Sequence, residues 1–371
     1  MKTLKGYGCG MGIGGWLTNY KRFNVLPQAW RHPITIGDME HFESYITERD
    51  VLNIKTMGFD HVRVGFDQIV LEETPYVYRE RIFELLENFV GWCKKYRLGV
   101  VFNLHKAVGN YCDIQEEAGL LDSEELQSRV VALWLKLEER FADEKFVFFE
   151  LLNEVLDVEP KLWNAFAEKL IKAIRAKNPT RPIIVGTTCW NSPDKLRDLQ
   201  VYDDENVFYT FHIYAPFEFT HQRGVLQPST MYYNRKMAYP SDIEPYRDYQ
   251  RLVYNAKEPY KKYEKMDKQF LYDALAGAKE FTEKYPDKTL WCGEFGTIRH
   301  ADVTSRENWM NDVISILQEY GIPYSVWNYL STPNDGNRFS LVDDDTREIL
   351  SDRLLRILLG DTDDDCDVGE W

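Results

Sequence analysis

The chain has 371 residues, of which 44% are hydrophobic and 28% charged, a composition typical of a folded globular protein. Its 45 basic and 60 acidic side chains give a net charge of −15 at pH 7, which opposes binding to phosphate backbones and anionic lipid surfaces. We therefore expect neither nucleic acid nor a membrane as a partner. Aromatic residues make up 14% of the chain, and sugar rings pack well on flat aromatic faces.

The cysteines and the N-terminus bear on the compartment. The six cysteines form no CxxC pair, which favours free thiols in a reducing compartment. The first residues lack an apolar segment of signal-peptide length, and no run reaches the roughly 18 apolar residues of a membrane span. These features predict a soluble protein, cytoplasmic as the chain is given and secreted if a leader has been removed.

Short apolar runs alternate along the chain with stretches of helical period. The expected strands cover residues 7–14, 61–66, 99–104, 146–153, 182–188, 207–214, 289–295 and 324–329. The expected helices cover residues 44–57, 79–96, 123–141, 160–177, 193–199, 267–284, 305–320 and 346–359. Eight strands that are apolar on both faces, each followed by a helix, predict an α/β fold: a single (β/α)8 TIM barrel spanning residues 1–360.

Three segments depart from this alternation. Residues 21–42 contain two prolines and little periodicity, so we expect a long loop over the C-terminal face of the barrel. Residues 215–266 form a long insertion after the sixth strand, and nine of the 23 tyrosines fall in 214–263. This insertion is either a lid beside the site or a tyrosine-packed prop without substrate contact. Residues 361–371, with six acids and no base, predict a solvated tail.

Polar residues stand at the ends of six expected strands, where barrel enzymes carry their catalytic groups. These residues are Arg63, His105, Asn153, Glu154, His212, Tyr214, Glu294 and Trp327. Glu154 and Glu294 follow the fourth and seventh strands, which face each other across a barrel. Their carboxyl groups can therefore lie about 5–5.5 Å apart, the separation used in retaining cleavage of glycosidic bonds.

The neighbours of the two glutamates indicate different roles. Glu154 begins an apolar, partly enclosed loop, which suits a general acid that later acts as a base. Glu294 could be held ionised by Arg63 and Tyr214, which suits the nucleophile. Asn153 would donate a hydrogen bond to the sugar 2-hydroxyl.

The remaining candidates would bind and position the sugar. His105 and His212 would hold hydroxyl groups. Trp16, Trp190, Trp327 and the tyrosines of 214–263 are the candidates for aromatic surfaces. A buried structural role remains an alternative for His212 and Trp327, and an ordinary ion pair for Arg63. The seven histidines show no HExxH-like spacing, so we expect no metal and no cofactor.

At these residues the sequence resembles glycoside hydrolase family 5, a group of (β/α)8 retaining β-glycanases, from Gly8 to about Leu359. The likeness is to the bacterial cellulase C type, in Gly-Gly-Trp at 14–16, Gly-Phe-Asp-His-Val-Arg at 58–63, Trp-Cys-Lys-Lys-Tyr at 92–96, Phe-Glu-Leu-Leu-Asn at 149–153, Asn-Ser-Pro-Asp at 191–194 and Phe-Thr-His-Gln at 219–222. The resemblance implies an endo-β-1,4-glucanase, with a β-linked oligo- or polysaccharide as substrate and often with action on mixed-linkage β-glucan.

Departures from that type leave the substrate open. The usual Asn before Leu-Gly-Gly-Trp is missing at 12–16, and the usual second histidine after the third strand is Lys106. These changes could shorten the groove. The alternatives are a β-mannanase or β-mannosidase of the same family, an exo-acting or transglycosylating β-glycosidase on short oligosaccharides, and a carbohydrate-binding protein on an inactive barrel.

Overall fold

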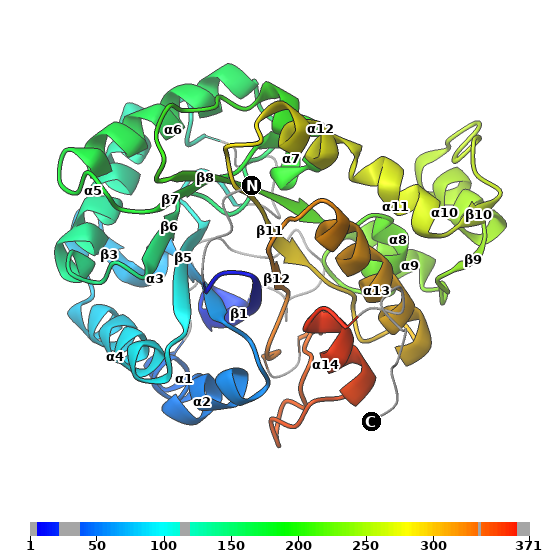
Figure 1. Cartoon of the computed structure of the whole chain (residues 1–371), viewed down its shortest axis with the longest axis horizontal. Coiled ribbons are helices and arrows are strands. Elements are labelled where there is room, and N and C mark those ends of the chain that lie inside the picture. The colour runs from blue at the N-terminus through cyan, green and yellow to red at the C-terminus, as the bar shows by residue number, and fades with distance from the viewer. Residues whose placement is uncertain (1–5, 22–37, 112–118, 333–334, 362–371) are drawn as a thin grey trace.

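The computed structural model describes residues 6–21, 38–111, 119–332 and 335–361. Its centre is a closed parallel barrel with the strand order β1-β12-β11-β8-β7-β6-β5-β2 (Figure 1). The barrel strands are β1 (Cys9–Leu17), β2 (His61–Asp67), β5 (Gly99–Lys106), β6 (Val147–Glu150), β7 (Ile183–Val185), β8 (Val207–Ile213), β11 (Leu290–Phe295) and β12 (Tyr324–Val326). The predicted (β/α)8 barrel is confirmed.

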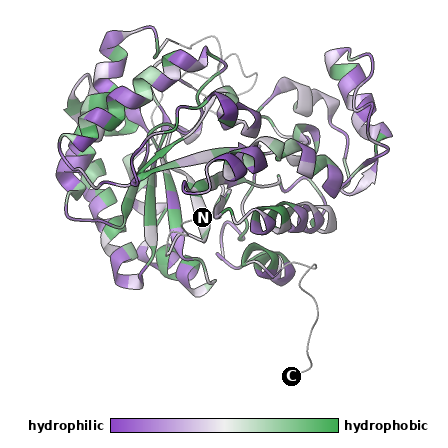
Figure 2. Cartoon of the chain, turned by 45° about the horizontal axis from the view of Figure 1, so that its top comes forward, coloured by the Kyte–Doolittle hydropathy of each residue, from purple (hydrophilic) through white to green (hydrophobic). Residues whose placement is uncertain are grey.

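Helices surround the barrel, and Figure 2 shows polar and apolar residues alternating around them. They are α2 (Glu48–Thr56), α4 (Glu80–Tyr96), α5 (Glu124–Phe141), α6 (Pro160–Arg175), η4 (Pro193–Asp198), α11 (Lys268–Ala274), α12 (Ala276–Lys284), α13 (Val303–Glu319) and α14 (Asp352–Leu358). In α6 the buried residues Trp163, Phe166, Ala167, Leu170 and Ile174 recur every three or four positions. That spacing places them on one face of a helix, which packs on the barrel.

Two predicted helix boundaries are wrong for local reasons. The helix expected over 44–57 begins only at Glu48, as α2, because Thr47 caps it and the Asp50 carboxylate accepts a 2.9 Å hydrogen bond from the Thr47 N–H. A separate short helix, α1 (Met39–Ser44), precedes it. The helix expected over 346–359 begins only at α14. The Asp343 carboxylate accepts the Thr346 N–H, and Arg347 has a φ of +67°, a left-handed conformation that ends helical continuation.

Several short elements were not predicted. They are α3 (Gln68–Leu71), the hairpin of β3 (Glu72–Thr74) and β4 (Val77–Tyr78), and α7 (Thr188–Asn191). Most of the loop expected over 21–42 lies outside the described residues, as does the acidic tail beyond residue 361, while α1 occupies the end of that loop.

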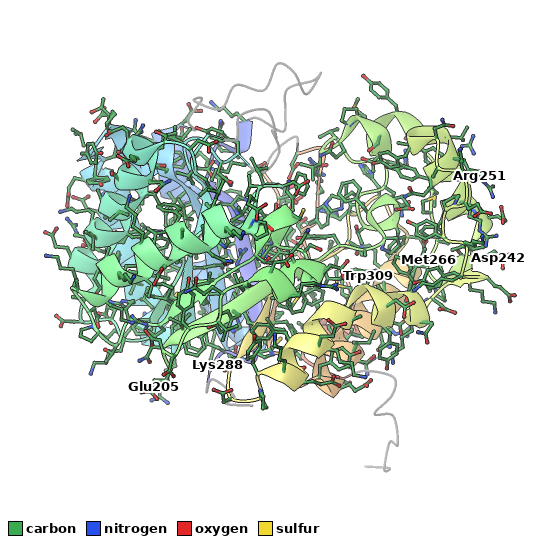
Figure 3. All side chains as sticks on the ribbon, turned by 90° about the horizontal axis from the view of Figure 1, so that it is seen from above. Glu205, Asp242, Arg251, Met266, Lys288 and Trp309 are labelled. Atoms are coloured by element: carbon green, nitrogen blue, oxygen red, sulfur yellow. The ribbon has the colours of Figure 1, made fainter. Side chains whose placement is uncertain are left out.

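The insertion, residues 215–266, projects from one side of the barrel (Figure 1). It contains α8 (Phe217–Thr220), α9 (Pro228–Tyr233), α10 (Glu244–Tyr254) and the antiparallel pair β9 (Ser241–Asp242) and β10 (Lys265–Met266). Figure 3 shows Asp242, Arg251 and Met266 together on it, on the opposite side from Glu205. Trp309 of α13 donates a 3.0 Å hydrogen bond to the Ala215 carbonyl, and this contact anchors the start of the insertion.

The core has two parts that together determine where a cavity can form. A large cluster fills the space between the strands and the helices. A second, smaller cluster lies near the starts of the strands and consists of Tyr7, Val101, Phe148, Ile184, Phe208 and Trp291. Because this second cluster packs the lower part of the barrel, the polar residues collect above it, at the carboxyl ends of the strands.

No helix in the described part of the chain combines the length and apolarity needed to cross a bilayer. Cys9, Cys93, Cys189 and Cys292 are free thiols, and Cys93 and Cys292 are buried. Burial raises the pKa of the Cys93 thiol, so it is unreactive as a nucleophile.

Candidate active site

A cavity of about 710 Å³ opens at the carboxyl ends of the barrel strands. Its volume lies within the range of about 300–1,000 Å³ that is typical of ligand sites. Seven of the predicted site residues line it: His105, Asn153, Glu154, His212, Tyr214, Glu294 and Trp327. Arg63 lies directly beneath the cavity and is fully buried. The structure thus brings together all but one of the predicted residues.

The two glutamates approach each other across this cavity. One ligand atom from each of Glu154, His212 and Glu294 lies within 4.8 Å of the other two. Inverting glycosidases need about 6.5–9.5 Å between their carboxyl groups to admit a water molecule, whereas retaining ones use about 5–5.5 Å. The arrangement therefore fits a covalent double displacement.

A β-bulge sets the direction of the Glu294 side chain. On β11 and β8, Cys292 pairs with Phe211 and Glu294 pairs with His212, so Gly293 is an extra residue in the ladder. A Cβ at Gly293 would lie 2.7 Å from the Thr210 hydroxyl, which is a steric clash. The bulge, which requires glycine here, turns Glu294 into the barrel beside His212.

Glu294 is held by a cation and a phenol. Arg63 Nη1 donates to Glu294 Oε1 at 2.5 Å, and the Tyr214 hydroxyl donates to Oε2 at 3.0 Å. Burial alone would lower the pKa of Arg63, but the charges of Glu150 and Glu294 outweigh it and raise that pKa above its ordinary value. Arg63 therefore remains a fixed positive charge under Glu294.

Glu150 completes this arrangement and was not predicted. It is fully buried on β6 and accepts hydrogen bonds from Arg63 Nε at 2.6 Å and Nη2 at 2.8 Å. Arg63 Nη2 also donates to Asn153 Oδ1 at 2.6 Å, which leaves the Asn153 amide nitrogen as the group able to donate to a ligand. A glutamate inside an otherwise apolar strand was the available signal.

Glu154 has a different neighbour. Its Oε1 lies 3.0 Å from His212 Nδ1, and its side chain is 16% exposed against 6% for Glu294. Burial first, and then the charge of Arg63, lower the pKa of His212 well below its ordinary value, so the imidazole is neutral. Glu154 thus faces a neutral ring while Glu294 faces a guanidinium, an asymmetry that suits a proton donor and a nucleophile respectively.

The floor of the cavity is aromatic. His105 and Trp327 stack with ring centroids 5.4 Å apart and an interplanar angle of 6°. A Cβ at Gly14 would lie 2.4 Å from the Trp327 ring, so only glycine permits this close approach of β1. Burial, followed by the charges of Lys106 and Arg63, lowers the pKa of His105, so it too is a neutral hydrogen-bonding group.

The predicted role of Trp16 as a sugar-binding surface is wrong. Trp16 is 1% exposed, donates from its indole nitrogen to the Phe42 carbonyl at 2.7 Å and packs against Phe89 of α4. It therefore belongs to the core between the barrel and the helices, because at this point of β1 the side chain faces outward. It does not line the cavity.

Trp190 lines the cavity instead and is 41% exposed. Cys189, Trp190 and Asn191 have φ values of +56°, +56° and +58°, and consecutive left-handed residues other than glycine are strained. The Trp190 N–H donates to the Val155 carbonyl at 2.9 Å, so this turn also braces the loop that carries Glu154. No glycine marks the turn in the sequence.

Glu154, His212 and Glu294 could in principle hold a metal ion, and they are the one such group among the described residues. Arg63, however, already places a guanidinium 2.5 Å from Glu294 and supplies a positive charge there. The guanidinium therefore opposes a metal cation at this position.

Replacing Glu150 by Gln is expected to lower the free energy of unfolding by about 3 kcal/mol, because it leaves part of the buried Arg63 charge unpaired. It should also lower kcat/KM, since Arg63 would no longer be fixed beneath Glu294. Glu138→Gln is the matched control, because Glu138 forms a similarly buried pair with Arg181, with an Nε–Oε2 distance of 2.6 Å. Urea unfolding and steady-state kinetics should show similar destabilisation for both variants, and a kinetic loss at equal folded fraction only for Glu150→Gln.

His221 predicts a loss of stability in acid. It is buried and stacked on Phe217, and burial lowers its pKa to about 3. Below about pH 6.5 the unfolded chain takes up a proton at His221 that the folded chain does not. The free energy of unfolding therefore decreases as the pH is lowered. Between pH 7 and 4.5 this amounts to about 2–3 kcal/mol. In urea unfolding, His221→Gln should lose that much less stability over this interval. Parallel pH curves would contradict the assignment.

A (β/α)8 barrel whose aromatic-lined cavity contains two opposed glutamates is typical of enzymes that cleave glycosidic bonds. The chain belongs to the cellulase family, glycosyl hydrolase family 5, whose model matches residues 28–332.

Individual relatives agree with this family. Endoglucanase C of Acetivibrio thermocellus is 36% identical over 94% of this chain and 97% of its own length. Cellodextrinase A of Ruminococcus flavefaciens is 30% identical over 84% of this chain and 82% of its own length. Cel5A of Thermotoga maritima, solved in complex with cellobiose and with mannotriose, is 25% identical with a TM-score of 0.71, covering 95% of this chain and 98% of that one.

Proposed function

We propose that this chain is an endo-β-1,4-glucanase that hydrolyses its substrate with retention of anomeric configuration. The observation that carries the proposal is the pair Glu154 and Glu294, with oxygens within 4.8 Å of each other and contrasting neighbours, His212 and Arg63. The similarity to Endoglucanase C over 94% of the chain supports β-1,4-glucan as the substrate class.

In the first step, a Glu294 oxygen attacks the anomeric carbon, and the bond to the leaving oxygen breaks as Glu154 donates a proton to it. Positive charge develops on the reacting sugar, and the Glu294 carboxylate, held by Arg63 and Tyr214, is aimed at it. The product of this step is a glycosyl ester of Glu294.

In the second step, Glu154, now a carboxylate, accepts a proton from water, and the resulting hydroxide-like oxygen attacks the same carbon. The ester bond breaks and Glu294 is released as a carboxylate. The Asn153 amide nitrogen is placed to donate to the sugar 2-hydroxyl, and Trp327 with His105 forms the floor on which that sugar lies.

The experiment is a product profile on cello-oligosaccharides of defined length, with proton NMR of the first-formed anomer. We expect internal cleavage and initial release of the β-anomer. Initial α-anomer would contradict the double displacement. Exclusive release of one sugar unit from a chain end would contradict endo action.

A β-mannan substrate is the second candidate, because the similar Cel5A has been solved with mannotriose as well as cellobiose. Comparing kcat/KM on barley β-glucan, carboxymethylcellulose and mannan separates the two. The similarity to a cellodextrinase supports testing short oligosaccharides, and product analysis at high acceptor concentration would reveal transglycosylation.

A further inference from the structure

Four of the eight tyrosines in the insertion hold it together or attach it to neighbouring helices through their hydroxyl groups. The hydroxyls of Tyr239, Tyr246, Tyr260 and Tyr263 donate to Asp312, the Ala238 carbonyl, Glu218 and Asp273, at distances between 2.6 and 2.7 Å. Tyr239 and Tyr246 are at most 1% exposed. These side chains have their hydrogen-bonding groups satisfied inside the protein, so they act as packing elements.

Tyr254 differs from them because it lines the same cavity as Glu154 and Glu294 and is 57% exposed. It is the last residue of α10, which ends where Asn255 adopts a left-handed φ of +52°. Its ring lies edge-on to buried Tyr249, with centroids 5.9 Å apart, and its hydroxyl lies 3.4 Å from Ser229 Oγ. The ring is therefore held in position while more than half of its surface stays accessible.

The barrel order places β8, the strand that precedes the insertion, on the same side of β11 and Glu294 as β6 and Glu154, away from β12 and Trp327. In the proposed function the reacting sugar lies on Trp327, which follows β12, and Glu154, which follows β6, protonates the leaving oxygen. The strands β6, β7 and β8 are neighbours, and they lead into Glu154, Trp190 and the insertion respectively. A chain leaving the catalytic glutamates in this direction passes Trp190 and then reaches the insertion.

We propose that Tyr254 forms a distal sugar-binding subsite that holds the leaving-group part of a glucan chain, beyond the sugar next to the cleaved bond. The ligand is a neutral pyranose ring, whose C–H face packs on the exposed face of the phenol. This inference rests on the proposed function, since it assumes that a β-linked glucan is cleaved between Glu154 and Glu294. In this proposal the insertion contributes one ring, Tyr254, to the binding surface, and Tyr249 packs against that ring.

The test compares two substrates in wild type and Tyr254→Ala. Cellohexaose can reach the insertion, whereas an aryl β-cellobioside has only an aryl leaving group and cannot. We expect the ratio of kcat/KM on cellohexaose to kcat/KM on the aryl cellobioside to fall about 5–20-fold in Tyr254→Ala, chiefly through a higher KM for cellohexaose. Tyr254→Phe, which keeps the ring, should stay within about twofold of wild type.

Tyr232→Ala is the matched control, because Tyr232 lies on α9 of the same insertion, is 73% exposed and does not line the cavity. Its ratio should equal that of wild type. An unchanged ratio in Tyr254→Ala, or an equal fall in Tyr232→Ala, would overturn the subsite. Failure of the wild type to hydrolyse either substrate would instead overturn the proposed function, so the two failures are distinguishable.

Discussion

Glu294→Gln is expected to lower kcat on cello-oligosaccharides by about four orders of magnitude or more while leaving the fold intact. A neutral amide is too weak a nucleophile to form the glycosyl ester, so the first step is lost. The amide oxygen can still accept a hydrogen bond from Arg63, which also keeps its pairing with Glu150. Single-turnover kinetics and thermal unfolding of the same preparation measure the two effects, and substantial hydrolysis by this variant would refute the assignment.

A smaller replacement at the same position tests the geometry of attack. Glu294→Ala leaves space for azide on the side of the sugar from which Glu294 would attack. With an activated aryl β-cellobioside, azide should restore turnover and give the α-cellobiosyl azide, because attack from that side inverts the anomeric carbon once. NMR of the product identifies the anomer.

Much of the fold could be predicted because the barrel strands are buried on both faces and separated by amphipathic helices. The errors fall where a few local hydrogen bonds or a left-handed residue outweigh a helical pattern. The Asp50 carboxylate caps the start of α2 by accepting the Thr47 N–H. The left-handed conformation of Arg347 prevents α14 from beginning earlier. Such contacts depend on backbone conformation, which the hydrophobic period does not report.

That Glu154 and Glu294 meet in one cavity could be predicted from topology, because Glu154 follows β6 and Glu294 lies near the end of β11, and the carboxyl ends of all barrel strands open on the same face. Glu150 was missed, and for Trp190 the sequence did not indicate the backbone conformation that brings its ring to the cavity. Glu150 acts from within β6 through Arg63, so its importance appears only when the ion pair is seen. Trp190 reaches the cavity through a left-handed turn without glycine, a conformation that residue types do not reveal.

Trp16 was predicted to face the substrate but is buried in the core. It stands beside the glycines of the predicted strand end, but the β1 register shifts between Ile13 and Leu17, and Gly15 has a φ of +75°. Inward and outward positions therefore cannot be counted through this stretch. The tryptophan that lines the cavity next to β1 is Trp327, and Gly14 makes room for it.

Glu154→Ala is expected to lose activity mainly on substrates whose leaving group must be protonated. Cello-oligosaccharides need a proton on the departing oxygen, so kcat/KM for them should fall by about 10²–10⁴-fold. A dinitrophenyl β-cellobioside leaves without protonation, so formation of the glycosyl ester should remain rapid. Its hydrolysis should then be slow, because no base activates water, and a pre-steady-state burst of dinitrophenol should appear.

Azide rescue distinguishes the roles of the two glutamates through the anomer of the product. In Glu154→Ala it can enter the space left by the carboxyl group and attack the glycosyl ester of Glu294 without base assistance, which should raise turnover. Two inversions then give the β-cellobiosyl azide, whereas Glu294→Ala should give the α-anomer. The same anomer from both variants would contradict the division of roles, because Glu154 and Glu294 must stand on opposite faces of the reacting sugar. His212 lies 3.0 Å from Glu154 Oε1 and 3.8 Å from Glu294 Oε2, so replacing it should weaken both steps without changing either anomer.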